Sequence, residues 1–200
     1  MKIGGFRSRI IYPYDHAVGM PEDGYFDWPG KGSVGSRWDR DYKRSLEFFG
    51  KNINRPWAGL YDHVKGKGLV HISNPRELRG IKIFSWGWCR DADMWSRILN
   101  DDMSKYVEMQ SGLFETQGIY ELLDVFDEKG WCETWFQIRD TKGYDAAGKN
   151  GILKLDNQEG KLAVRLLLTM TALEAELCVK QDGYEIFRRK LEAACNTAMH

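Results

Sequence analysis

Residues 63–88, HVKGKGLVHISNPRELRGIKIFSWGW, carry the clearest indication of the fold class. Apolar and polar residues alternate on both sides of a central polar loop, and this alternation is typical of half-buried β-strands. In the second run, Ile81 and Ile83 share one face, whereas Phe84 and the tryptophans that follow it share the other. The stretch therefore predicts two short strands that pair as a hairpin with one apolar and one aromatic face.

Similar alternation continues in two later segments. Residues 105–112 (KYVEMQSG) place apolar residues, beginning with Val107, on one face, and residues 131–138 (WCETWFQI) separate a mixed Trp/Glu/Gln face from an apolar one. Half-apolar strands of this kind are typical of antiparallel sheets. We expect the runs between Leu69 and Ile138 to be neighbouring strands of a single curved sheet. The segment at residues 90–104 is either a helical turn or a crossing loop.

The composition changes in the last third of the chain. Residues 140–151 (DTKGYDAAGKNG) are rich in turn formers and read as a linker or an extended loop. Residues 161–194 have high helix propensity, yet two alternating runs flank Asp182-Gly183, which is a hairpin signal. We favour strands to about residue 188, and expect residues 143–200 to form a small β segment, either an Ig-like sandwich piece or a hairpin.

The counts of charged residues and cysteines, and the lengths of the apolar runs, argue against several classes of protein. Lys plus Arg and Asp plus Glu number 29 each in 200 residues, so an excess of positive charge for nucleic-acid or membrane-surface binding is absent. No apolar run approaches the roughly 20 residues of a membrane span, and the first residues lack a signal-peptide core. Four scattered cysteines without metal-site spacing predict free thiols and a cytoplasmic location. We expect no cofactor and no metal.

Aromatic residues make up 13% of the chain, and many stand beside Asp, Glu, Arg or Gly. Aromatic faces interleaved with hydrogen-bonding groups suit a surface that binds sugars. The alternative is that a β-rich core uses aromatic side chains because they pack well on pleated surfaces.

Three segments between Phe49 and Asp140 carry a resemblance to a known family: WAGLYDHVKGKGLVHISNPRELRGIKIFSWG, WSRILNDDMSKYVEMQSGLFETQ and WCETWFQIRD. Together they resemble a bacterial family of uncharacterised domains with the galactose-mutarotase-like β-supersandwich, often found next to tetratricopeptide repeats. The resemblance implies an all-β fold, an antiparallel supersandwich of which residues 1–142 would be the C-terminal half. Several strands precede this point in the family, so we expect a homo-oligomer, a complementary chain or an incomplete coding sequence.

The resemblance also directs the choice of site residues. Mutarotase-like chemistry needs a carboxylate and a histidine on opposite sides of one sugar, and Glu108 and His63 are the candidate catalytic pair. The candidate substrate-binding residues are Trp86, Trp88, Tyr106, Gln110 and Asp62. Each has a structural alternative, such as a solvated strand face, a turn or a contact between sheets. His71 alternates with core residues and is expected to be structural.

The sequence thus predicts a domain that binds or processes a mono- or oligosaccharide on an aromatic and polar sheet face. The alternative is a non-catalytic module for protein interaction or self-association.

Overall fold

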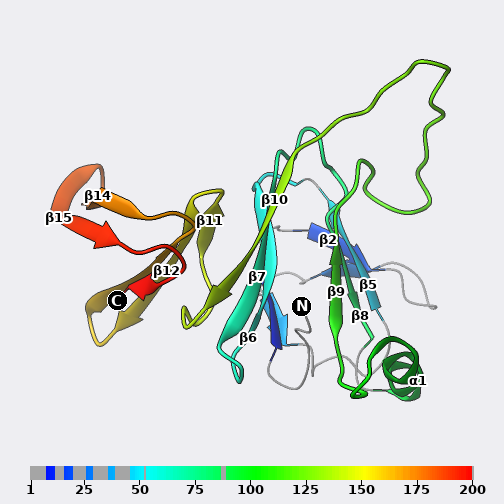
Figure 1. Ribbon diagram of the computed structural model, residues 1–200, viewed down its shortest axis with the longest axis horizontal. Coiled ribbons are helices and arrows are strands. Elements are labelled where there is room, and N and C mark those ends of the chain that lie inside the picture. The colour runs from blue at the N-terminus through cyan, green and yellow to red at the C-terminus, as the bar shows by residue number, and fades with distance from the viewer. Residues whose placement is uncertain are drawn as a thin grey trace.

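The computed structural model describes residues 8–11, 16–19, 26–28, 36–38, 46–51, 53–86 and 89–199. Within these residues the chain forms antiparallel β-sheets and one short helix, so the expected all-β, sandwich-like fold is confirmed (Figure 1). None of the described residues form a helix that is long and apolar enough to span a bilayer.

Two five-stranded sheets form the larger part of the structure. Sheet A consists of β1 (Ser8–Ile11), β4 (Ser36–Trp38), β6 (Trp57–Asp62), β7 (Lys67–Ser73) and β10 (Glu133–Arg139), in the order β10-β7-β6-β1-β4. Sheet B consists of β2 (His16–Gly19), β3 (Phe26–Trp28), β5 (Leu46–Lys51), β8 (Lys82–Ser85) and β9 (Val107–Gln110), in the order β3-β2-β5-β8-β9. Strands β10 and β9 are therefore edge strands, one in each sheet.

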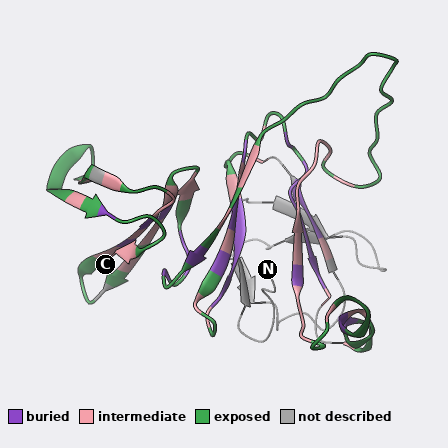
Figure 2. Cartoon of the chain, viewed as in Figure 1, coloured by how far each residue is buried: buried purple, intermediate pink, exposed green. Residues whose placement is uncertain are grey.

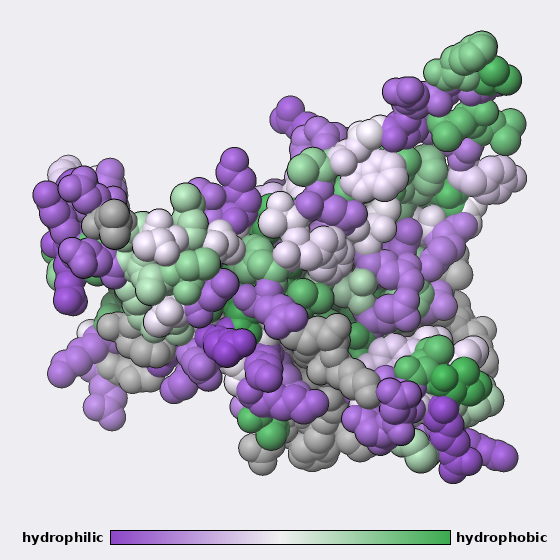
Figure 3. Space-filling model, in the orientation of Figure 1, coloured by the Kyte–Doolittle hydropathy of each residue, from purple (hydrophilic) through white to green (hydrophobic). Residues whose placement is uncertain are grey.

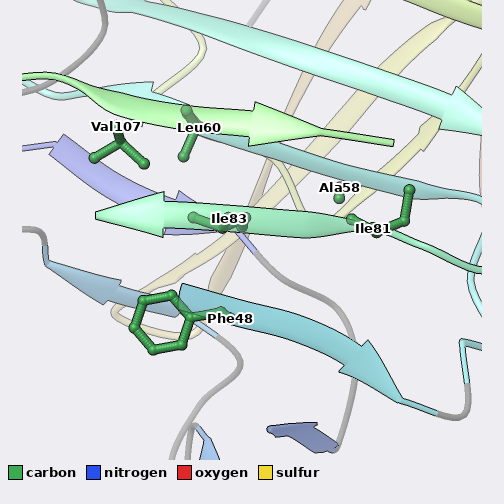
Figure 4. Close-up of a cluster of buried hydrophobic side chains, with 6 residues drawn as sticks. All are labelled: Phe48, Ala58, Leu60, Ile81, Ile83 and Val107. Atoms are coloured by element: carbon green, nitrogen blue, oxygen red, sulfur yellow. The ribbon is translucent and has the colours of Figure 1, made fainter. Parts of the chain in front are cut away.

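Sheets A and B pack face to face around a hydrophobic core (Figure 4). The buried members of this core are Phe48, Ala58, Leu60, Ile81, Ile83 and Val107. Successive side chains of a strand point to opposite faces. Because Val107 points into the core, Glu108 lies on the face of sheet B that is turned away from sheet A.

A third layer covers the other face of sheet A. Sheet C consists of β11 (Ala146–Gly148), β12 (Gly151–Gln158), β13 (Lys161–Leu168) and β16 (Ala198–Met199), in the order β11-β12-β13-β16. The core between sheets A and C contains Tyr61, Val70, Ile138, Tyr144, Ile152 and Leu167. Sheet A is thus the middle of three layers, with the core shared with sheet B on one face and the core shared with sheet C on the other.

Gly59 of β6 allows Tyr144 to pack closely against sheet A. A Cβ atom at Gly59 would lie 1.9 Å from the Tyr144 hydroxyl oxygen and 2.3 Å from the Leu69 carbonyl oxygen. The Tyr144 ring also makes an edge contact with Trp57, with 5.4 Å between ring centroids. The absence of a side chain at Gly59 therefore sets the spacing between sheet A and the segment that leads into sheet C.

The C-terminal segment forms a long hairpin, as expected from its alternation. Strands β14 (Ala172–Gln181) and β15 (Tyr184–Ala193) pair antiparallel and are joined by Asp182-Gly183. Both turn residues have positive φ, 51° and 85° respectively, as a two-residue type I′ turn requires. Strand structure extends beyond residue 188, the limit expected from sequence.

The expected hairpin between residues 63 and 88 is wrong. Strand β7 belongs to sheet A and β8 to sheet B, so the loop between them crosses from one sheet to the other. The expectation of a single curved sheet between Leu69 and Ile138 is wrong for the same reason, because β7 and β10 pair in sheet A while β8 and β9 pair in sheet B. Alternation reveals that a strand has an apolar face, but it does not reveal which partner that face packs against.

The segment between β8 and β9 contains a helix, α1 (Arg90–Leu99), which was one of the two expected possibilities. Ala92 and Ser96 lie on its buried side, one helical turn apart. Asp91 and Asp93 in the first turn have a favourable interaction with the helix dipole.

The boundary expected between residues 142 and 143 falls in the connection from β10 to β11. The division into two domains stays a prediction. The connection itself is tied to sheet A, because the backbone N–H of Lys142 donates to the hydroxyl of Tyr61 at 3.0 Å.

Candidate functional site

The candidate site lies where the edge strands of sheets A and B face each other. Glu133 is the first residue of β10, and Ser111 directly follows β9. His71 lies on β7 opposite Trp135 of β10. His71, Glu133 and Trp135 share the face of sheet A that is turned toward sheet B, since Leu69 on the same face of β7 packs against the core between the two sheets.

The loop that carries Ser111 is held in place by a close backbone contact. The N–H of Gly80 donates to the carbonyl oxygen of Gly112 at 2.9 Å. A Cβ atom at Gly80 would lie 1.8 Å from the carbonyl oxygen of Phe114. Gly80 therefore permits the chain after β9 to pass against the chain that leads into β8, which positions Ser111 at the edge of the sandwich.

The carboxylate of Glu133 is the centre of a hydrogen-bond network, here called the edge cluster. Its Oε2 atom is 2.9 Å from Nε2 of His71 and accepts hydrogen bonds from the Trp135 indole at 3.0 Å and from the Ser111 hydroxyl. Its Oε1 atom accepts a longer hydrogen bond, of 3.4 Å, from the indole N–H of Trp131. The His71 ring packs against Trp135 in a tilted arrangement, with 4.4 Å between centroids and 46° between the ring planes.

The protonation states follow from burial and from these contacts. Burial alone would raise the pKa of Glu133, but the hydrogen bonds that it accepts outweigh burial and hold its pKa below the ordinary value. Burial lowers the pKa of His71 below the ordinary 6.5, against the hydrogen bond and charge of Glu133. At neutral pH the carboxylate is therefore ionised and the imidazole neutral, so Nε2 of His71 carries the proton and its N–H donates a hydrogen bond to the Glu133 carboxylate.

The edge cluster is open to solvent on one side. The side chain of Glu133 is 27% exposed, and Trp131 and Trp135 are 47% and 39% exposed, whereas His71 is buried. An ionised carboxylate has about four lone-pair sites, and among the described residues Oε1 receives only the long contact from Trp131. The cluster therefore offers an acceptor oxygen between two accessible indole rings.

Four of the predicted site residues gather elsewhere, on the outward face of sheet B. The rings of Trp86 and Tyr106 are 6.2 Å apart, and the Gln110 amide donates to Glu108 at 2.5 Å. Burial, followed by the charge of Glu108, raises the pKa of Tyr106. Trp95 of α1 packs against Trp86 at 5.1 Å. Tyr106, Glu108 and Gln110 thus share a face, as expected, but α1 partly covers it.

The predicted catalytic pair does not share a site. Glu108 faces away from sheet A, whereas His63 follows β6 and contacts the Tyr61 ring, at 4.9 Å, on the side of sheet C. The two residues belong to different sheets and to opposite sides of the sandwich, so the described structure does not bring them together.

Asp62 has a structural position in the turn between β6 and β7. Its buried carboxylate accepts hydrogen bonds from the backbone N–H groups of Val64 and Lys65, at 2.9 and 3.0 Å. These bonds stabilise the turn, as Asp side chains commonly do. Trp88, the remaining predicted residue, lies outside the described residues.

Sequence reasoning did not select Glu133, Ser111 or Trp135 as site residues. The signal was present in WCETWFQI, where alternation places Trp131, Glu133 and Trp135 on one face. The partner His71, expected to be a structural histidine, is indeed buried and hydrogen-bonded. Among the described residues, no three His, Cys, Asp or Glu side chains are grouped so that they could hold a metal ion.

The fold and the edge cluster thus define a layered β-sandwich domain with an open polar edge. Residues 10–133 match the family model of a domain of unknown function, DUF5107. Because this match spans more than half of the chain, the protein belongs to that family.

A solved structure has a similar fold. It is a TPR-domain containing protein from Parabacteroides distasonis ATCC 8503, with 24% sequence identity and a TM-score of 0.50. The similarity covers 68% of this chain and 20% of that chain, so this chain spans about a fifth of the other protein. At this identity the similarity concerns the fold alone.

Proposed function

We propose that this domain binds a saccharide at the edge cluster. The observation that carries the proposal is the carboxylate of Glu133, which is held between two partly exposed indole rings and has an acceptor oxygen facing them. A sugar presents an apolar ring face and a rim of hydroxyl groups. The edge cluster offers a flat aromatic surface for the first and a charged acceptor for the second.

The energetics of such a contact are favourable but moderate. Aromatic contacts add about 0.5–1.5 kcal/mol beyond the burial of their area. A hydrogen bond to a charged group contributes about 1.5–3 kcal/mol. One stacked ring and one hydroxyl bonded to Glu133 together contribute about 2–4.5 kcal/mol, which corresponds to a dissociation constant of about millimolar or weaker.

The geometry favours binding over acid–base catalysis at this cluster. A general base works best with a pKa near the working pH, whereas the pKa of Glu133 is held below its ordinary value. His71 is buried behind Glu133 and Trp135, so its imidazole does not reach a ligand at the open edge. The two residues are suited to hold a fixed negative charge.

We also propose that sheets A and B are the part of a galactose-mutarotase-like supersandwich that the sequence resemblance implies. The face-to-face packing of two antiparallel five-stranded sheets supports this.

The four cysteines are free thiols, which supports the proposal of a reducing, cytoplasmic setting.

The experiment is isothermal titration of the protein with a panel of mono- and oligosaccharides, together with tryptophan fluorescence. We expect at least one sugar to release heat and change the emission. Trp131→Ala should weaken that affinity about tenfold, since it removes an exposed ring. The matched control is Phe126→Ala, which removes a ring that is 98% exposed and lies outside the edge cluster. Absence of heat with every sugar, or equal effects of the two variants, would contradict the proposal.

A further inference from the structure

The connection between β9 and β10 contains a long exposed segment, residues 117–130, here called the arm (Figures 1 and 2). Six large apolar side chains within eight residues of the arm are exposed: Ile119, Tyr120, Leu122, Leu123, Val125 and Phe126. The most extreme are Leu122 at 86% and Phe126 at 98%. In Figure 3 the arm protrudes at the upper right, where hydrophobic (green) and hydrophilic (purple) residues lie side by side.

Isolated exposed apolar residues are ordinary, but a contiguous cluster marks an interaction site. The arm also has a strong charge. Residues 119–128 contain four carboxylates and no Lys or Arg, namely Glu121, Asp124, Asp127 and Glu128. Lys129, just beyond them, pairs with Glu121 at 3.3 Å. The arm therefore requires a partner surface that is apolar and carries positive charge.

Such a surface exists at the other end of the same chain. A cavity of about 440 Å³, here called the groove, lies between β13 and the β14–β15 hairpin. Leu177, Val179, Phe187 and Leu191 line its hairpin side. A cavity of about 150 Å³ can hold a benzene ring, so the groove has room for about three side chains of that size.

The charge of the groove is complementary to that of the arm. Its lining includes Arg165 and Arg189 and no acidic residue. Arg165 is paired with Asp156, whereas Arg189 forms no ion pair with any described residue. Two acidic residues of the hairpin, Glu176 and Glu185, lie on its other face, where they bind Arg188. Cross-strand pairing puts Leu177 opposite Arg189, on the groove side.

We propose that the arm of one copy of this chain docks into the groove of a second copy. Figure 1 shows the arm and the hairpin at opposite ends of the molecule, so an arm cannot reach the groove of its own chain. Apolar side chains of the arm fill the groove, and its carboxylates approach Arg189. Two reciprocal contacts of this kind close a symmetric dimer, in which each surface is used once.

The test uses sedimentation velocity and light scattering over a range of concentrations. The wild-type protein is expected to dimerise as its concentration rises. An arm variant, Leu122→Ser with Phe126→Ser, and a groove variant, Arg189→Glu, should each weaken dimerisation at least about tenfold. All three substituted side chains are exposed, so the variants should fold, and circular dichroism checks this.

The decisive measurement is an equimolar mixture of the two variants. The intact groove of the arm variant can receive the intact arm of the groove variant, so the mixture should form a heterodimer that neither variant forms with itself. A monomeric wild-type protein, or an arm variant that dimerises normally, would overturn the proposal, as would a mixture that stays monomeric. Saccharide binding, which uses neither Phe126 nor Arg189, should be unchanged in both variants.

Discussion

Ser111 and Glu133 connect the edges of two different sheets by a side-chain hydrogen bond. Ser111 follows the edge strand of sheet B, and Glu133 begins the edge strand of sheet A. Edge strands otherwise present unpaired backbone groups. The bond therefore fixes the distance between the two edges at the place where the candidate site opens to solvent.

We predict that Ser111 and Glu133 are energetically coupled. Ser111→Ala should lower the free energy of unfolding by about 1 kcal/mol, and Glu133→Gln by about 1–3 kcal/mol, because several donors lose a charged acceptor. The double variant should be less destabilised than the sum of the two, with a coupling of about 0.5 kcal/mol or more. Urea denaturation of the four proteins in the cycle measures this. Strict additivity would show that the bond has no energetic role.

Stability should fall as the solution becomes acidic, first because of His71. Its pKa is lower in the folded protein than the ordinary 6.5, so the unfolded chain takes up a proton before the folded chain does. Stability is therefore lost as the pH falls below about 6.5. Glu133, whose folded pKa is also lowered, adds a loss below about 4.5, the ordinary value for Glu. The measurement is the urea midpoint between pH 7.5 and 4.

The matched variant for the pH experiment is His71→Gln, which keeps a hydrogen-bond donor near Glu133 but does not titrate. We expect this variant to be less stable than the wild type at pH 7.5, since the His71 ring also packs against Trp135. Its stability should change less than that of the wild type between pH 6.5 and 5. Parallel pH profiles for the two proteins would assign the acid sensitivity to other groups.

Gly59→Ala should be strongly destabilising, although it adds only one methyl group to sheet A. The added methyl group would overlap the Tyr144 hydroxyl and the Leu69 carbonyl oxygen, and overpacking of a buried site typically costs about 1–3 kcal/mol. Gly148→Ala is the control, since this strand glycine has open space at its Cβ position. Thermal unfolding should show a clear fall in the midpoint for Gly59→Ala and little change for Gly148→Ala. A well-tolerated Gly59→Ala would mean that Tyr144 moves freely.

Local patterns were sufficient to predict the strands but not their arrangement. The alternation in residues 105–112 and 131–138 correctly indicated β9 and β10, and Asp182-Gly183 correctly indicated the turn between β14 and β15. The pairing of β7 and β8 was predicted wrongly because the eight-residue connection between them can close a hairpin or cross between sheets. The energy that decides between them comes from contacts that are distant in sequence.

The site residues could likewise be predicted only in part, because sequence patterns show which residues share a face but not which strands pair. Glu108 and Gln110 lie on β9 and Tyr106 directly precedes it, so alternation alone places them on one face. The edge cluster joins His71, Ser111 and Glu133, which are separated by 40 and 22 residues in the chain. A histidine expected to be structural and a glutamate on a mixed strand face become partners only once β7 and β10 pair.

Two further variants test whether a saccharide binds at the edge cluster or on the outward face of sheet B. Trp135→Phe removes the indole N–H that donates to Glu133 at 3.0 Å but retains an aromatic ring beside His71. The affinity of this variant for a sugar that the wild type binds should fall about fivefold to tenfold. The reason is that the lost hydrogen bond holds the Glu133 carboxylate in the position in which it accepts from the sugar. Glu108→Gln, on the outward face of sheet B, should leave the affinity unchanged within about twofold. Titration calorimetry with the same sugar measures both variants. A strong loss in Glu108→Gln combined with normal binding by Trp135→Phe would move the saccharide to the face that carries Tyr106 and Gln110.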